Sequence, residues 1–359
     1  MKKILLTICA VVVIGAIIAM NILQDQQTSG KRNVYALLPL TGPMAQTGKD
    51  AKAVMDHYYK NGNYGFNLVY IDSETNPTKA ITALQQKAIN DDSPIVVAAL
   101  SGVVSAVAPY VQQKNGFLYA ITACNKDLPA FLRLHSDVDG MLEPTVSYIK
   151  NHYKNIAIVY VEDEFGRLER NYFTKRMEEL SIPVYEVSIG LKTLDVRNEV
   201  LKVISKNPEA VVIMGVPNQG YINVMRELKT QEYKGQIFMD PAITSPHIRT
   251  QIPNDIMGTC LSLEAEASKN ERQQQFQADL SNMNMPIYSM LIEAADVLNL
   301  IQHTLDNNLA FTQETYNNMK QWEGISGTIK FFGKGDTAYK YLLVRYKDGK
   351  FIPIESEER

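Results

Sequence analysis

Small and polar side chains follow five predicted buried strands of this 359-residue sequence. Small residues let a ligand approach backbone N–H groups, and ligands bind open α/β sheets at the carboxyl ends of their strands. Each such segment taken singly is also ordinary turn chemistry, so it is their recurrence that predicts a binding site. The candidate site residues are Thr47, Ser101, Gly102, Ala123, Asn125, Phe165, Asp240, Ala242 and Tyr288. The two aromatic members could stack on a bound ligand or cover it.

The sequence lacks the short motifs of common enzymes. It contains no GxGxxG, no GKS/T phosphate loop, no HExxH, no CxxC and no GxSxG. The acidic run 162–164 is expected to be a solvated charge run, and Asp240 is more typical of a helix cap or turn than of a ligand contact. The five histidines show no metal-ligand spacing. We therefore expect no catalytic residue, no metal site and no cofactor.

Strands and helices alternate along the chain, which is typical of parallel sheets with helical crossovers. Apolar runs predict strands at 34–38, 68–71, 95–100 and 117–121, and a second series at 156–161, 184–189, 210–214, 236–239 and 258–263. The break between the series lies near 129–139, without a long linker. Two amphipathic helices at 271–280 and 286–305 follow, then a pair of strands at 328–332 and 339–346. We predict an α/β fold with two similar lobes that face each other across a cleft.

The N-terminus is expected to export the chain. Lys2 and Lys3 precede an apolar run from 4 to 23, and a polar stretch follows. Residues 1–32 therefore read as a signal peptide or N-terminal membrane anchor plus a tether, with the rest outside the cytoplasm. The net charge of −3 and the lack of a basic cluster argue against nucleic-acid binding. Cys124 and Cys260 fall in separate strand–helix units, which favours unpaired thiols.

Five segments resemble one known family in order and spacing. They are LLPLTGPMAQTGKDAKA at 37–53, DSETNPTKAITALQQ at 72–86, FLRLHSDVDG at 131–140, FMDPA at 238–242 and SGTIKFFGKGD at 326–336. The chain resembles the type I periplasmic binding proteins of the branched-chain amino acid (leucine/isoleucine/valine) group. The resemblance implies two Rossmann-like lobes joined by three crossovers, with the N-terminal lobe at 33–138 and 270–325 and the C-terminal lobe at 139–269 and 326–359. It also implies hinge closure on a small solute and delivery to an ABC permease in the membrane.

The residues that hold the amino acid in that family are mostly replaced here. Gly102 stands where family members have a serine for the ligand carboxylate, with Ser101 just before it. Ala123-Cys124-Asn125 replaces an Ala-x-Thr motif. The position of the glutamate that pairs with the ligand ammonium is Ala242, with Asp240 two residues earlier, and Thr47 replaces an aromatic residue, whereas Phe165 keeps one. A buried zwitterion needs paired donors and a carboxylate, so these departures argue against a simple α-amino acid.

Two functions of different classes remain open from the sequence. The first is a non-enzymatic, extracytoplasmic solute-binding protein of an ABC transporter, which closes on a small polar solute, amino acid-like or other. The alternative is a membrane-anchored ligand-sensing or interaction module that regulates an envelope partner. A hydrolase on this scaffold comes third, because no nucleophile is evident.

Overall fold

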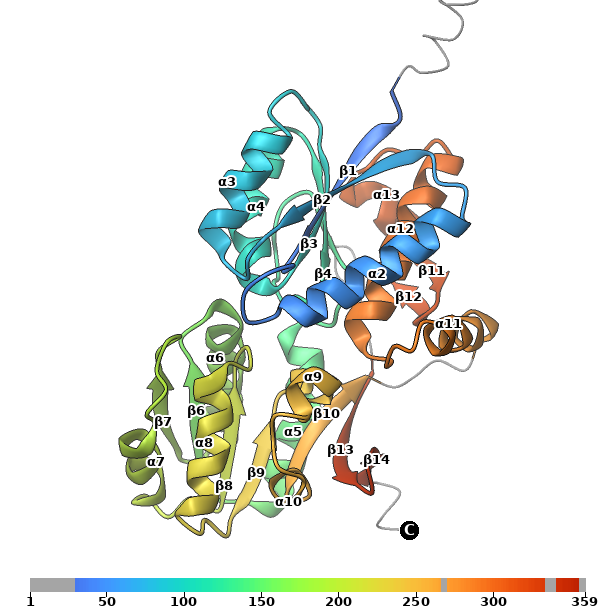
Figure 1. Ribbon diagram of the computed structural model, residues 1–359. Helices are drawn as coiled ribbons and strands as arrows, with labels where there is room; N and C mark the ends of the chain where they lie inside the picture. Colours follow the sequence, from blue (N-terminus) through green and yellow to red (C-terminus); the bar gives the residue numbers. More distant parts are fainter. Residues whose placement is uncertain (1–29, 266–269, 333–339, 355–359) are drawn as a thin grey trace, which may run out of the picture.

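The protein forms two α/β lobes, one above the other in Figure 1. The computed structural model describes residues 30–265, 270–332 and 340–354. We call the lobe that carries the first strand the N-lobe and the other the C-lobe. The expected signal peptide or anchor lies outside the described residues. Within the described ranges, no helix is long and apolar enough to cross a membrane.

The N-lobe is built on a parallel five-stranded sheet with the order β2-β1-β3-β4-β5. Its strands are β1 (Arg32–Leu38), β2 (Phe66–Asp72), β3 (Ile95–Ala99), β4 (Phe117–Ile121) and β5 (Phe131–Arg133). Its helices are α2 (Ala45–Asn61), α3 (Pro77–Lys87), α4 (Ser101–Gln113), α11 (Glu271–Asn282), α12 (Ser289–Asp306) and α13 (Gln313–Met319). A short hairpin of β11 (Gln321–Gly324) and β12 (Gly327–Lys330) packs beside α12.

Side chains of β1 alternate between the two faces of this sheet, as a strand requires. Val34 and Ala36 join the core cluster that contains α2 and α12, whereas Tyr35 and Leu37 join the cluster under α3 and α4. These helix pairs cover opposite faces of the sheet (Figure 1). A sheet covered on both faces reads as continuous apolar runs, which is why its strands were predictable.

The C-lobe contains a seven-stranded sheet with the order β14-β13-β10-β9-β8-β6-β7. Its strands are β6 (Ile156–Val161), β7 (Val184–Ile189), β8 (Ala210–Met214), β9 (Gln236–Met239), β10 (Cys260–Ala265), β13 (Tyr341–Lys347) and β14 (Lys350–Pro353). Its helices are α5 (Val138–His152), α6 (Glu164–Glu179), α7 (Arg197–Ile204), α8 (Gln219–Thr230), η1 (Pro241–Thr244), α9 (Pro246–Arg249) and α10 (Asn254–Met257). The last two strands, β13 and β14, are antiparallel to their neighbours.

The strands predicted at 328–332 and 339–346 correspond to β12 and β13, but they lie in different lobes. β12 pairs with β11 in the N-lobe hairpin, whereas β13 pairs with β10 in the other lobe. Asp296 of α12 holds the hairpin, because its carboxylate accepts hydrogen bonds from the backbone N–H groups of Ile325 (2.6 Å) and Ser326 (3.0 Å). Residue 326, the lobe boundary that the resemblance implies, lies in this turn.

Candidate functional site

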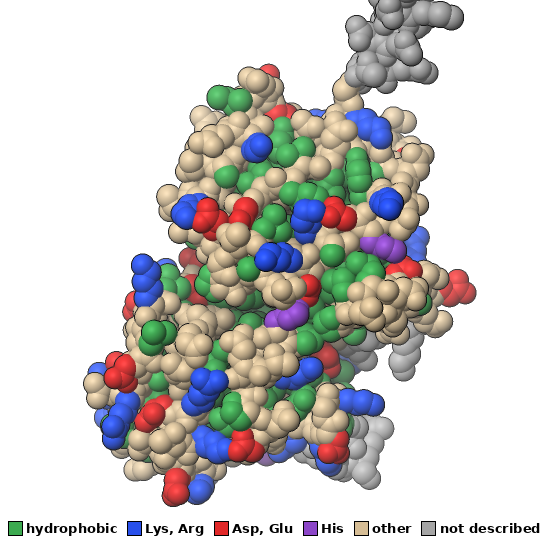
Figure 2. Space-filling model, viewed as in Figure 1, with side chains coloured by type: hydrophobic (Ala, Val, Ile, Leu, Met, Phe, Trp, Pro, Cys, Tyr) green, Lys and Arg blue, Asp and Glu red, His purple; other side chains and the backbone are tan. Residues whose placement is uncertain are grey.

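The carboxyl ends of the parallel strands in the two lobes face each other, and the lobes touch there. Ser105 of α4 donates a hydrogen bond to the carboxylate of Glu164 in α6 (3.4 Å). A Cβ placed on Gly102 would lie 3.7 Å from the Cβ of the same glutamate, which is an ordinary van der Waals distance, so the two lobes are in close proximity here. In the space-filling view the two lobes meet along the middle of the molecule (Figure 2).

The N-lobe wall contains four of the predicted site residues in buried positions. Thr47, Ser101, Ala123 and Asn125 each have exposed fractions of 4% or less. The Ser101 hydroxyl accepts a hydrogen bond from the backbone N–H of Cys124 (3.1 Å), which fixes one strand-end loop against the next. The amide nitrogen of Asn125 donates to Ser105 (2.7 Å), but its amide oxygen has no partner in the part of the chain that the structure describes.

The C-lobe wall presents Phe165, Asp240 and Ala242. Phe165 and Ala242 are half-buried, whereas Asp240 is buried at the carboxyl end of β9. One carboxylate oxygen of Asp240 accepts a hydrogen bond from the N–H of Ala242 (2.7 Å), so the predicted cap is confirmed. Its other oxygen, Oδ2, has no hydrogen-bond partner among the described residues. Burial, with a contribution from the Asp163 carboxylate, raises the pKa of Asp240 to about 7.

The sequence reading missed two further carboxyl groups in this wall. Asp163 caps α6 through the N–H of Gly166 (2.7 Å) and also accepts from the N–H of Val216 (2.9 Å). The expectation of a solvated run at 162–164 is therefore wrong for this residue, because its carboxylate joins two strand ends. Glu169, fully buried on the inner face of α6, accepts from the N–H of Gly215 (2.7 Å). Burial, reinforced by Asp240, raises the pKa of Glu169 well above its usual range.

Tyr288 takes part in a contact between the lobes. Its hydroxyl donates to Oδ2 of Asp50 in α2 (3.0 Å), and Nε2 of His247 in α9 lies 2.6 Å from the same oxygen. Gln46 donates to the other oxygen of Asp50 (2.8 Å). The phenol of Tyr288 is therefore hydrogen-bonded within the protein. Neither Asp50 nor His247 was among the predicted site residues.

A buried ionic network lies where the chain crosses between the lobes. Glu293 of α12 accepts from the N–H of Thr122 (2.5 Å) and lies 2.7 Å from Nδ1 of His135, which follows β5. The hydroxyl of Tyr341, on β13, is 3.2 Å from the other ring nitrogen. Burial alone lowers the pKa of His135, but the Glu293 carboxylate reverses this and the net pKa is raised to about 10.

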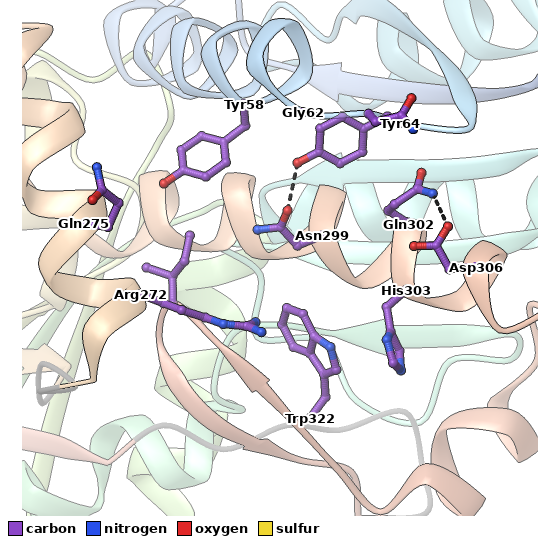
Figure 3. Close-up of a pocket in the computed structure, with 12 residues that line it drawn as sticks. Tyr58, Gly62, Tyr64, Arg272, Gln275, Asn299, Gln302, His303, Asp306 and Trp322 are labelled. Atoms are coloured by element: carbon purple, nitrogen blue, oxygen red, sulfur yellow. Dashed lines mark hydrogen bonds between the residues drawn. The ribbon is translucent and has the colours of Figure 1, made fainter.

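Two pockets differ in their position relative to the lobes. A polar pocket of about 470 Å³ lies on the outer side of the N-lobe, between α2, α11, α12 and β11 (Figure 3). It contains Tyr64, Asn299 and Trp322 and none of the predicted site residues. A second pocket, of about 290 Å³, opens between the lobes and includes Tyr288, Pro241 and Tyr341.

The described residues contain no cluster of three or more His, Cys, Asp or Glu side chains that could hold a metal ion. Cys124 and Cys260 are both free and buried, as their spacing predicted. On the face shown in Figure 2, acidic and basic side chains are interspersed, without a broad area of one sign.

The sequence model of the periplasmic binding protein family matches residues 34–350. The chain belongs to the periplasmic binding protein family. The predicted type I, leucine-binding-protein-like membership is thereby confirmed. No curated protein sequence gives a significant match. Members of this family work outside the cytoplasm and bind small molecules.

Solved structures share the fold of this periplasmic binding protein at low sequence identity. The leucine binding protein LivK from Thermotoga maritima is 16% identical, with a TM-score of 0.79 over 90% of this chain and 97% of that one. A solute binding protein of an ABC transporter from R. palustris, in complex with benzoate, is 15% identical, with a TM-score of 0.79 over 90% and 96%. An extracellular ligand binding receptor from Desulfohalobium retbaense is 15% identical, with a TM-score of 0.78, but only 60% of its chain is covered, against 91% of this one.

Proposed function

We propose that this protein is the extracytoplasmic solute-binding component of an ABC transporter. It holds a small polar solute between the two lobes, and a membrane permease binds the closed conformation. One observation carries the proposal: buried polar side chains of both lobes meet at facing strand ends, and some of their atoms have no partner within the described protein. Such atoms cost free energy unless a ligand or water satisfies them.

The contacts between the lobes explain how a solute would favour closure. A ligand shifts a conformational equilibrium only through its differential affinity for the two states. Asn125 belongs to one lobe and Asp240 to the other, and each has an oxygen left without a protein partner. A solute that binds both oxygens stabilises the closed arrangement, because opening would break contacts with one lobe.

The replaced residues bear on the choice of solute. Gly102 and Ala242 offer no side-chain donor or acceptor at the two positions where the resemblance places groups that hold an α-amino acid. We therefore propose a polar solute other than leucine or a similar amino acid. The residues of the cleft act by binding, and the proposal assigns none of them a catalytic role.

Native mass spectrometry of protein purified from its host's envelope tests this function. We expect a co-purifying small molecule that is lost on unfolding, and a smaller radius of gyration by small-angle X-ray scattering when it is added back. An apo mass, with no change of melting temperature or radius of gyration across a broad metabolite panel, would count against solute binding.

A further inference from the structure

The C-lobe wall of the cleft contains three carboxyl groups and no paired cation. Asp163, Glu169 and Asp240 lie at the carboxyl ends of β6, β8 and β9, which are adjacent strands of one sheet. In the described chain, no Lys, Arg or His side chain forms an ion pair with Glu169 or Asp240. Arg167, an exposed residue of α6, acts on Asp163 electrostatically.

Two of these groups have a buried oxygen that is not fully satisfied by donors of the described protein. Oε1 of Glu169 and Oδ2 of Asp240 are buried and without a hydrogen-bond partner in the described ranges, although the residues are only 0% and 2% exposed. The Tyr221 hydroxyl donates to the backbone carbonyl of Ile213 (3.3 Å) and also lies close enough to the Asp240 side chain to lower the pKa of that carboxyl group.

The facing N-lobe wall supplies a third acceptor. The side chain of Asn125 is 4% exposed, and its amide oxygen is the atom left without a partner. Its neighbour Cys124 is close enough for its thiol to act on the pKa of Glu169 across the interface. These three atoms, one from the N-lobe and two from the C-lobe, are hydrogen-bond acceptors, which a donor-rich ligand would complement.

The buried positive charges of the N-lobe have carboxylate partners of their own. The Arg133 guanidinium lies 3.9 Å from the Asp137 carboxylate and donates to the backbone carbonyls of His135 (2.8 Å) and Asn125. The His135 ring pairs with Glu293. The buried carboxyl groups of the cleft without an ion-pair partner in the described chain are therefore Glu169 and Asp240 of the C-lobe.

We propose that the cleft binds a small organic cation, a primary amine or amidine, whose N–H groups donate to Asp240, Glu169 and Asn125. This inference rests on the proposed solute-binding function and names the chemical class of its solute. A buried carboxyl pair without a cation is stable only if it retains a proton, since two adjacent carboxylates repel each other. The arriving ammonium or amidinium group replaces that proton, which leaves to the buffer.

Proton release follows from the groups that surround the pair. Burial raises the pKa values of both carboxyl groups, and Asp163, Tyr221 and Cys124 are the titratable groups beside them. Near pH 7 binding should release up to about one proton per cation. The apparent affinity should therefore increase as the pH rises from about 5.5 to about 8.

Isothermal titration calorimetry in two buffers of different ionisation enthalpy tests the proposal. The probes are putrescine as the amine and benzamidine as the amidine, with 1,4-butanediol as the neutral analogue, choline as a cation without N–H donors, and benzoate as an anion. We expect the two N–H cations to bind with proton release and the other three to bind more weakly or not at all. Asp240→Asn and Glu169→Gln keep the acceptor for Ala242 or Gly215 but should lower amine affinity about ten- to hundredfold.

Glu143→Gln is the matched control, because that carboxylate bonds Tyr172 and Arg176 on the outer surface of the C-lobe. The Glu143→Gln protein should bind putrescine with the affinity of the wild type. Circular dichroism should show that all three variants are folded. Binding and closure with benzoate or the diol, unchanged by Asp240→Asn, would overturn the cation assignment while leaving solute binding intact. If none of the probes and no solute of the wider panel shifts the melting temperature or the radius of gyration, both proposals fail.

Discussion

At the scale of single residues, the buried ionisable groups of the interlobe region divide into paired and unpaired sets. His135 and Glu293 form an ion pair with exposed side-chain fractions of 6% and 1%. A buried ion pair stabilises the folded protein little more than a pair of apolar side chains would. Removal of one partner is strongly destabilising, because the other charge is left buried and unpaired. Asp240 and Glu169 have no cationic partner within the described residues, and burial raises the pKa values of both groups, which favours their protonated forms. The presence of a charged partner thus distinguishes the His135–Glu293 pair, which is structural, from the C-lobe acids of the proposed binding site.

Glu293→Gln should expose the role of that pair. In the wild type His135 has a raised pKa of about 10, so its stabilising contribution is full below about pH 6.5 and is lost as the pH rises toward 10. Without the carboxylate, burial alone should lower the pKa of His135 below its usual value. We expect a loss of about 3–5 kcal/mol in unfolding free energy at pH 6. Urea denaturation at pH 6 and pH 9.5 and NMR titration of His135 measure both effects.

The exposed Glu314→Gln substitution in α13 is the control for that experiment. It should change unfolding free energy by less than about 0.5 kcal/mol. An imidazole of His135 that titrates in the Glu293→Gln protein as it does in the wild type would contradict the assigned ion pair.

At the scale of elements, most strands and helices were predictable because their signals are local. The run 184–189 coincides with β7, and Asn76-Pro77 begins α3 with the asparagine accepting a hydrogen bond from the N–H of Lys79. The three-residue β5 was missed, since so short a segment carries no periodicity. The partner of β12 was also missed, because strand pairing depends on packing that is distant in sequence.

The β11–β12 hairpin should loosen when its anchor is removed. Asp296 is fully buried, and burial raises its pKa to about 6 despite the hydrogen bonds from Ile325 and Ser326. Asp296→Ala leaves the buried N–H groups of the turn without an acceptor, which should cost about 2–4 kcal/mol. Trp322 is the only tryptophan of the sequence and lies in β11, so its emission reports on the hairpin. We expect a red shift and a lower melting temperature.

Asp306→Ala, on the same helix, is the matched control, because that carboxylate accepts from Gln302 at the exposed end of α12. Its Trp322 emission should match that of the wild type. Unaltered emission in Asp296→Ala would show that the hairpin is held by other contacts.

At the scale of the whole molecule, the sequence predicted the walls of the cleft better than the contacts that close it. Asp240 directly follows β9 and Asn125 lies in the loop after β4, so their place at the sheet edges could be predicted from local order. Asp50 and His247 meet across 197 positions of sequence, and Glu169 lies on a helix face that otherwise packs in the core. No local pattern marks such residues, because only the folded arrangement of both lobes brings them together.

The contact between Asp50 and His247 should bias the equilibrium between open and closed lobes. His247 is the C-lobe partner, whereas Asp50 is held in the N-lobe by Gln46 and Tyr288. The His247 side chain is 34% exposed, so solvent screening limits the free energy of this contact to about 1 kcal/mol. Such a free energy corresponds to a fewfold shift in the population of closed molecules. His247→Ala should therefore enlarge the ligand-free radius of gyration and weaken solute binding a fewfold. His303→Ala should change neither, because the His303 ring lies in the N-lobe and hydrogen-bonds Asn307 of its own helix (3.3 Å). Equal scattering profiles for wild type and His247→Ala would mean that the cleft closes without this contact.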